Sequence, residues 1–332
     1  MTTETPARST HASPVHEAPA AIRATGVVVV LTVVIAIVAL AFALPAARTA
    51  PHDVPIGAAG PQAASGQLAA TMEQHAPGAF SVTYYPSADA LREAISARDV
   101  YGGIALGPDG PTLMIATGGS PMIAQMLTQI GSGIAQKTGT QLQVEDLAPP
   151  TADDPRGAGL AASALPITLA GLLPAIALML ALKREVWTRF AAAVVFAGVA
   201  GLSIAALLRW VLRSFDANFW GVAGALTLGT LAMGLTLLGL GSLFGRVGLA
   251  LGAVFALLVG NPLSGLNSAP ELLPSGWGHF GQFLPQGANA TLLRSAAFFD
   301  GSGGAVPVIV LACWTAVGAA LIVLAALRRR ET

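Results

Sequence analysis

The chain has 332 residues, of which 54% are hydrophobic and only 10% are charged. Soluble domains carry about 25% charged residues, so this composition indicates a protein that lies largely in lipid. Lysine plus arginine equals aspartate plus glutamate at 17 each, and no basic cluster marks a long polar surface, which argues against a nucleic-acid partner.

The N-terminal segment, residues 1–23, is rich in Thr, Ala, Pro and His and lacks an apolar period, which predicts a disordered tail. An almost unbroken apolar run follows, and we assign residues 24–48 to a first membrane helix. A cleaved signal peptide with Ala41-Phe42-Ala43 as its cleavage site is the alternative. Signal peptides have apolar regions of about 7–15 residues, and this run is longer, which favours an uncleaved anchor.

A mixed polar region at 49–160 has the alternating pattern of an α/β domain with a partly parallel sheet. Ser120 is a suitable N-cap for one of its helices, because Pro121 follows at the first helical position. The apolar and β-branched patterns predict strands at 54–58, 80–85, 101–106, 112–117 and 142–147, and helices at 65–75, 88–98 and 121–137.

Five further apolar segments follow the α/β domain, most of them close to the roughly 20 residues that an α-helix needs to cross a bilayer core. With the first helix they predict a polytopic α-helical membrane protein of six transmembrane helices, in which residues 161–328 form a five-helix domain. The segments lie near 163–182, 190–208, 219–244, 247–262 and 304–327. The single cysteine, Cys313, is interpreted as a small buried side chain in the last of them.

Basic residues near the ends of the helices indicate the orientation, because cytoplasmic flanks carry an excess of Lys and Arg. With the N-terminus in the cytoplasm, nine flanking basic residues lie inside and five outside. This orientation gives a multi-pass protein of the plasma (inner) membrane, with residues 49–160 outside and a short cytoplasmic tail at 329–332. The inner set is Arg8, Arg23, Lys183, Arg184, Arg189, Arg246, Arg328, Arg329 and Arg330, and the outer set is Arg48, Arg156, Arg209, Arg213 and Arg294.

Small residues repeat at a spacing of four around the fourth and fifth apolar segments. The pairs are Gly241 with Gly245 and Gly248 with Gly252. This spacing is typical of helices that approach closely in lipid. The pairs predict tight packing inside one bundle, and the sharper alternative is a dimer or pathway surface.

Residues 261–303 form the most unusual segment. Asn261-Pro262 ends the fifth apolar segment too early for a full crossing, and later prolines and glycines alternate with large apolar side chains. The segment is too apolar for a free loop, so we predict a re-entrant pair of short helices in the outer leaflet, lying against protein or a water-filled cavity. Charges at that depth often mark a pathway, although they could equally face headgroups and water. The candidate pathway residues are Asn261, Pro262, Glu271, Trp277, His279, Pro285 and Arg294.

No catalytic or cofactor-binding constellation stands out. Residues 131–138 nearly spell a phosphate-binding loop, but Gln136 occupies a position that requires glycine. The five histidines have no metal-ligand spacing. We therefore expect no enzyme activity, no metal and no cofactor, and any ATP hydrolysis would belong to a partner.

Several short sequence motifs in the chain resemble those of a known family. Around the 49–160 region they are Leu91-Arg92-Glu93-Ala94-Ile95, Asp99-Val100-Tyr101-Gly102-Gly103-Ile104 and Ala116-Thr117-Gly118-Gly119-Ser120-Pro121. Before the last apolar segment they are Gly260-Asn261-Pro262, Leu273-Pro274-x-x-Trp277, Leu284-Pro285-x-Gly287-Ala288 and Leu293-Arg294. Together with the order of apolar segments, over most of residues 25–328, they resemble the type-2 ABC transporter permeases, especially the phage-infection-protein (YhgE/Pip) branch.

The resemblance implies a permease subunit of an exporter that pairs with itself or with a similar permease and works with a separate ATP-binding subunit. In such permeases a cytoplasmic loop between the second and third helices meets the ATPase, which here points to Lys183, Arg184, Glu185, Trp187 and Arg189. A basic topological flank is the simpler interpretation of the same residues. Residues 1–23 lack the amphipathic helix on the inner surface that such permeases have.

A different class of function is also open. The chain could be a scaffold or surface receptor in an envelope or secretion assembly, with the outer domain as its functional surface. Five helices after that domain exceed what an anchor needs, so the permease hypothesis is favoured.

Overall fold

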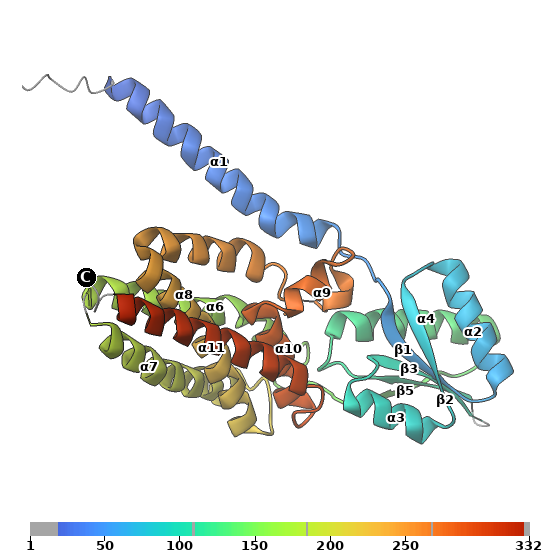
Figure 1. Ribbon diagram of the computed structural model, residues 1–332. Coiled ribbons are helices and arrows are strands. Elements are labelled where there is room, and N and C mark those ends of the chain that lie inside the picture. The colour runs from blue at the N-terminus through green and yellow to red at the C-terminus, as the bar shows by residue number, and fades with distance from the viewer. Residues whose placement is uncertain (1–18, 108–109, 184, 267, 329–332) are drawn as a thin grey trace, which may run out of the picture. The chain divides into compact units, whose positions relative to one another are not determined.

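The computed structural model describes residues 19–107, 110–183, 185–266 and 268–328 (Figure 1). The chain divides into two compact units, residues 1–41 and 42–332. Helix α1, Ala20–Ala47, begins in the first unit, and its valine, leucine and isoleucine side chains are exposed all around it. A helix that is apolar on every side is suited to lipid rather than to water.

The second unit contains a five-stranded sheet in the order β2-β1-β3-β4-β5. β1 pairs in parallel with β2 and β3, β4 pairs in parallel with β5, and β3 and β4 form an antiparallel hairpin. The predicted partly parallel α/β sheet is thus confirmed. The strands are β1 Val54–Ala59, β2 Phe80–Tyr85, β3 Gly102–Gly107, β4 Gly110–Ile115 and β5 Gln143–Asp146.

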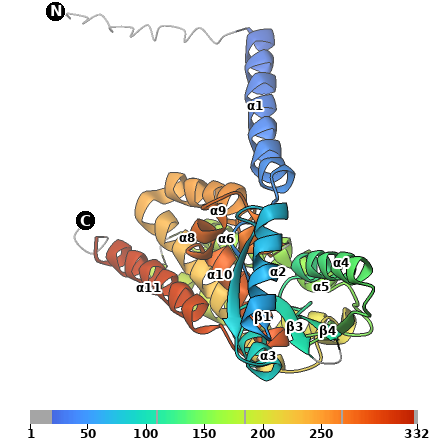
Figure 2. The same ribbon diagram turned by 90° about the vertical axis from the view of Figure 1, so that its right-hand side faces the viewer.

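Three helices cover the two faces of this sheet (Figure 2). They are α2 Gln62–His75, α3 Ala88–Ala97 and α4 Pro121–Thr138. Successive strand residues point to opposite faces. Ile104 and Leu113 therefore join a core with residues of α2 and α4, whereas Ala105 and Met114 join a core with α3.

Local sequence signals set the ends of these helices. The Ser120 hydroxyl accepts a hydrogen bond from the Ile123 backbone N–H, which confirms the predicted N-cap of α4. Ser87 caps α3 in the same way through the Ala90 N–H. Helix α3 ends at Arg98, which adopts a left-handed conformation with φ 68°. That conformation turns the chain toward β3.

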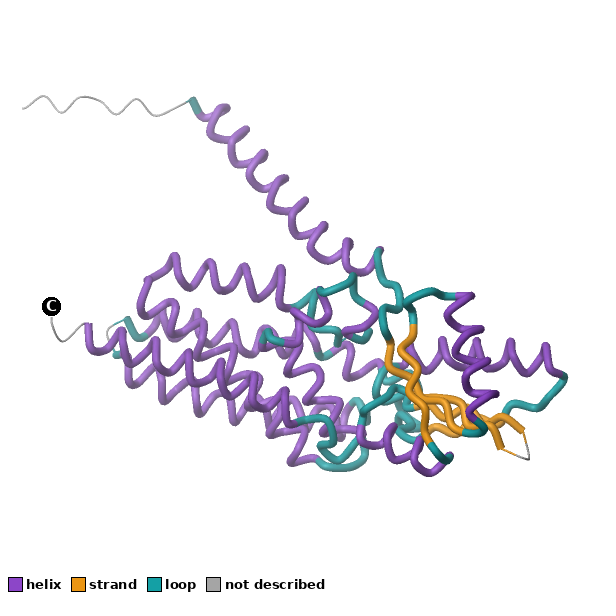
Figure 3. The backbone as a smooth tube through the Cα atoms, turned by 45° about the vertical axis from the view of Figure 1, so that its right-hand side comes forward, coloured by secondary structure: helices purple, strands orange, loops and turns teal. Residues whose placement is uncertain are grey.

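Long apolar helices make up the rest of the second unit and run side by side (Figure 3). Helix α8 is central and packs against α6, α7, α10 and α11. The elements are α5 Ala158–Ala162, α6 Ala164–Ala181, α7 Val186–Ala206 with the π-helical turn η1 Leu207–Val211, α8 Phe219–Phe255 with the π-helical turn η2 Ala256–Gly260, the 3₁₀ turn η3 Pro270–Leu272, α9 Trp277–Gln282, α10 Pro285–Phe298 and α11 Ala305–Arg328.

The described residues hold five helices long and apolar enough to cross a membrane, where the sequence predicts six. The difference lies in α8, which includes both predicted segments 219–244 and 247–262 and has a non-helical residue, Gly245, between them. A mostly helical chain with five such helices and a small α/β sheet is consistent with a polytopic membrane protein. Cys313, predicted to be buried, is exposed on α11, because the residues around it face outward from the bundle.

Helix α8 folds back on itself at Gly245 (Figure 1). A Cβ atom built on Gly252 would lie 2.8 Å from Cδ2 of Leu237. In a straight helix these residues would be about 22 Å apart. The reversal depends on φ 67° and ψ −151° at Gly245, a conformation that is essentially restricted to glycine.

Candidate functional site

The sheet and the 261–303 segment meet in a shared interface, here called the seam. Leu272 joins the core between the sheet and helices α2 and α4, and Phe299 joins the core between the sheet and α3. Backbone N–H groups of Ala50 and His52 donate hydrogen bonds to the carbonyls of Leu272 and Glu271, at 3.1 and 2.9 Å. The 261–303 segment therefore completes both cores of the α/β domain.

Tyr101 and Glu271 form the first side-chain contact of the seam. Tyr101 lies directly before β3, and its hydroxyl donates a hydrogen bond of 2.8 Å to Oε2 of Glu271. Burial raises the pKa of the Tyr101 phenol above its ordinary value, and the nearby Glu271 carboxylate raises it further. The phenol therefore stays protonated and remains a hydrogen-bond donor at physiological pH.

Arg98 forms the second contact, from the left-handed end of α3. Its Nη1 donates to the Thr291 carbonyl oxygen at 3.0 Å and to the Ser295 hydroxyl. The guanidinium also lies 5.1 Å from the centre of the Phe299 ring, within cation–π range. Burial lowers the pKa of Arg98, but an arginine starts so high that it stays charged. Arg98 thus joins the sheet directly to α10.

Arg294, a predicted pathway residue, is buried and makes three hydrogen bonds to backbone carbonyls. Its side chain is 6% exposed, and it donates to the carbonyl oxygens of Gly265, Leu266 and Ser268 at 3.0, 2.6 and 3.0 Å. Carbonyl groups in an irregular segment need such donors when they are buried. Arg294 therefore acts as a structural clamp on the turn before η3, and it also lines a cavity of about 240 Å³.

A cavity of about 470 Å³ lies in the seam. Arg98 and Glu271 both line it, yet they form no ion pair within 4.0 Å. Nδ1 of His52 is buried and has no hydrogen-bond partner among the residues that the structure describes, and His52 lines this cavity. Other polar residues of its wall are Asp53, Tyr101, His279, Gln282 and Thr291.

The candidate pathway residues lie in several places. Glu271 and His279 line the seam cavity, Arg294 lines a second cavity, and Trp277 lies on α9 with 37% of its side chain exposed. Asn261 and Pro285 line a separate cavity inside the helix bundle. Pro262 follows η2 in a turn. The sequence could not show this division, because all seven residues lie within one short stretch.

The cavity inside the bundle measures about 20 Å³ and has a polar wall. Gln286 donates to the Ala256 carbonyl at 3.0 Å, and Thr168 donates to Asn261 at 3.3 Å. Asn289 packs so closely on α8 that a Cβ on Gly229 would lie 2.3 Å from its Cγ. Gln286 and Asn289 were missed by sequence reasoning, although two amides in an apolar stretch are a usable signal.

Helix α10 carries both Gln286 and Asn289. Twelve of its 14 residues are buried, and it packs against α8, α9 and α11. A helix buried on nearly all sides is a core element rather than a surface loop. The predicted pair of short helices corresponds to α9 and α10.

The proposed coupling loop is shorter than predicted. Helix α7 begins at Val186, so Trp187 and Arg189 lie in its first turns rather than in a loop. Lys183, Glu185 and Trp187 are exposed, but Arg189 is fully buried and contacts Sδ of Met179. Arg189 is therefore not a surface contact in this structure, and Arg184 lies outside the described residues.

The predicted packing glycines have separate places in the α8 hairpin. Gly241 faces Leu249 at 3.2 Å from a built Cβ, and Gly248 and Gly252 face Leu240 across the two arms. Gly245 has nothing within 4 Å of a built Cβ and forms the turn. Glycines at this spacing thus allow the two arms of the α8 hairpin to pack closely against each other.

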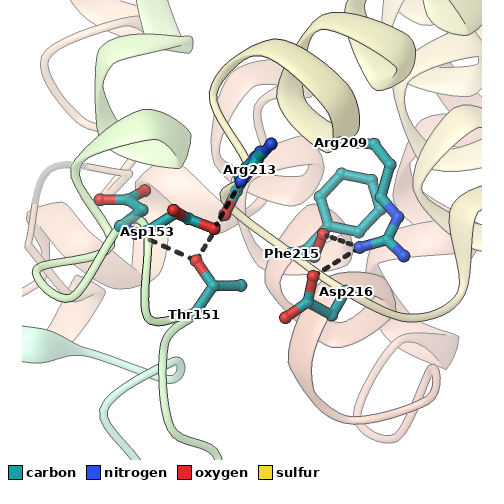
Figure 4. Close-up of polar contacts among 7 residues, drawn as sticks. Thr151, Asp153, Arg209, Arg213, Phe215 and Asp216 are labelled. Carbon is teal, nitrogen blue, oxygen red and sulfur yellow. Dashed lines mark hydrogen bonds and ion pairs between the residues drawn. The ribbon is translucent and has the colours of Figure 1, made fainter.

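A second polar contact joins the linker after the sheet to the loop between α7 and α8 (Figure 4). Arg213 forms an ion pair with Asp153 at 3.2 Å, and the Thr151 hydroxyl donates to the Arg213 carbonyl. Arg209 binds Asp216 at 2.6 Å on the neighbouring loop. These side chains are largely exposed, so their contribution to stability is small.

Comparisons with protein-family models, with curated proteins and with solved structures each found no match. Among the described residues no group of three or more His, Cys, Asp or Glu side chains is arranged to hold a metal ion. The seam and its cavity are therefore interpreted from their own geometry.

Proposed function

We propose that this chain is the membrane permease subunit of an ABC-type exporter, forming a translocation path as a dimer and driven by a separate ATP-binding subunit. The proposal includes six crossings, with the two arms of α8 as the fourth and fifth, both termini in the cytoplasm and the sheet outside. The family resemblance in the sequence motivates it, and the structure supplies a mechanical argument.

The observation that carries the proposal is the continuous contact from the sheet to the centre of the bundle. Arg98 binds the backbone and side chain of α10, and Asn289 of α10 packs against Gly229 of α8. α8 in turn contacts α6 and α7, whose connection carries Lys183 and Glu185. Packed cores move as units rather than deforming continuously. A movement started at the α6–α7 connection would therefore reach the outer domain through α8 and α10.

The first test is purification of the full chain from native membranes in mild detergent, followed by mass spectrometry and an ATPase assay. We expect an ATP-binding subunit to co-purify, with ATPase activity that is lost when its hydrolytic site is inactivated. Recovery with envelope or secretion proteins and without an ATPase would favour the scaffold hypothesis instead.

A second test addresses the connection itself. The double variant Lys183→Ala and Glu185→Ala removes two exposed charges, and we expect it to abolish stimulation of the partner's ATPase while the chain stays folded. Glu93→Gln, an exposed change on α3, is the matched control. Equal stimulation in both variants would reject this connection as the coupling site.

A further inference from the structure

The seam cavity is lined by two oppositely charged side chains, Arg98 and Glu271, that form no ion pair with each other. Arg98 uses Nη1 for Thr291 and Ser295, and within the described chain its Nε and Nη2 have no hydrogen-bond partner. Glu271 uses Oε2 for Tyr101, and its Oε1 has no partner there. The two groups line one cavity, influence each other electrostatically and form no ion pair. Each therefore has hydrogen-bonding capacity left for a third molecule.

The charge balance of the wall indicates the kind of molecule. Two carboxylates, Asp53 and Glu271, face one guanidinium, Arg98, and two imidazoles, His52 and His279. A pure anion would leave the carboxylates unneutralised and repelled, and a pure cation would do the same to Arg98. A ligand with both charges satisfies both sets. The volume of about 470 Å³ lies in the range of roughly 300–1,000 Å³ found for small-molecule sites.

Helix α9, which provides His279 to the cavity wall, adds a second observation. Trp277 and Phe280 in this helix, and Phe283 directly after it, have exposed side chains. Exposed aromatic side chains beside polar groups are typical of the membrane–water interface. These side chains would place α9, and with it the cavity wall that His279 lines, at the level of lipid headgroups.

We propose that the seam cavity binds a small zwitterion, with its ammonium group at Glu271 and Asp53 and its oxyanion at Arg98 and His52. Two sources share this chemistry, the headgroup of a zwitterionic phospholipid and a free zwitterion of the same type. Binding would bridge the α/β domain, in which Asp53 precedes β1 and Arg98 ends α3, and the 261–303 segment, which carries Glu271. The inference does not rest on the permease function, because binding needs no ATPase.

The test uses the full chain in lipid nanodiscs or detergent. Phosphoethanolamine is the soluble probe, titrated by calorimetry beside ethanolamine alone and inorganic phosphate alone. Native mass spectrometry then measures retention of phosphatidylethanolamine against phosphatidylglycerol. We expect phosphoethanolamine or phosphatidylethanolamine to bind at least about tenfold more tightly than the single-charge compounds, because each lost charged hydrogen bond costs about that factor.

Two variants locate the site. Glu271→Gln keeps an acceptor for the Tyr101 hydroxyl and removes the negative charge, so the seam stays closed while zwitterion binding weakens roughly tenfold. Arg98→Gln should weaken binding as well, and its unfolding temperature reports any damage to the seam. Arg213→Gln is the control, because Arg213 pairs with Asp153 outside the cavity.

The possible results distinguish the two sources of the ligand and also test whether the zwitterion site exists. Retention of phosphatidylethanolamine without binding of soluble phosphoethanolamine identifies the lipid headgroup, and soluble binding identifies a free zwitterion. Phosphate binding as tight as phosphoethanolamine binding, equal retention of both lipids without binding of soluble phosphoethanolamine, or an unaffected Glu271→Gln variant would each overturn the zwitterion site. Failure of all probes would overturn it too, whatever is found about the ATPase.

Discussion

At the scale of single residues, buried polar side chains form hydrogen bonds that stabilise non-helical backbone next to the apolar helices. Arg294 gives three hydrogen bonds to carbonyls of the turn before η3, where the chain is not helical and cannot satisfy those groups itself. Tyr101 and Arg98 donate hydrogen bonds that join the α/β domain to the segment that follows α8. Each of these side chains lies at a place where a buried polar group would otherwise lack a partner.

Arg294 provides the clearest stability prediction. Arg294→Gln cannot span three carbonyls, and each buried polar group left without a partner costs about 1–3 kcal/mol, so we expect a loss of about 3 kcal/mol or more. The midpoint of thermal unfolding in detergent, followed by tryptophan fluorescence, measures the change. Arg156→Gln, at an exposed arginine in the linker, should leave the midpoint nearly unchanged. Equal midpoints for the two variants would contradict the clamp.

At the scale of elements, α8 and α10 give the bundle its form. α8 is long enough to be counted as one apolar helix, yet Gly245 turns it into two antiparallel arms. α10 is short and polar by comparison, yet it is almost entirely enclosed. A count by helix length and hydropathy alone therefore gives one crossing for α8, although the apolar pattern of the sequence separates residues 219–244 from 247–262.

The hairpin depends on one glycine. Gly245→Ala forces a side chain into φ 67° and ψ −151°, which costs about 1–3 kcal/mol or straightens the helix. Gly224→Ala is the matched control, because Gly224 lies within the helix with nothing within 4 Å of a built Cβ. There the change should be neutral or stabilising by up to about 1 kcal/mol. Chemical denaturation of both variants in the same detergent gives the comparison, and equal stabilities would contradict a strained turn.

At the scale of the whole molecule, the arrangement proposed in the membrane is open to direct measurement. Single cysteines replace Asp89 in the sheet domain and Lys183 before α7, in a Cys313→Ser background because Cys313 is exposed. We expect a membrane-impermeant maleimide to label the Asp89→Cys protein in intact cells and the Lys183→Cys protein only after permeabilisation. Labelling of both in intact cells would rule out the proposed orientation.

The local structure follows from the amino-acid sequence alone. Strand alternation, the Ser120 cap and the apolar runs depend on neighbours within a few residues, so β1 to β5, α2 to α4 and the long apolar helices lie close to the predicted positions. The start of α7 was misplaced by four residues, because Trp187 and Arg189 are polar or interfacial yet also compatible with a helix.

The contacts of the seam, the close packing of the two arms of α8 and the burial of α10 depend on tertiary packing. Tyr101 and Glu271 lie 170 residues apart, and Arg98 and Thr291 lie 193 apart, so no local pattern links them. Gly245 belongs to a regular small-residue spacing that suggests helix packing equally well. The physical reason is common to all three. Each depends on which distant surfaces exclude solvent together, and that is a property of the packed chain rather than of any segment.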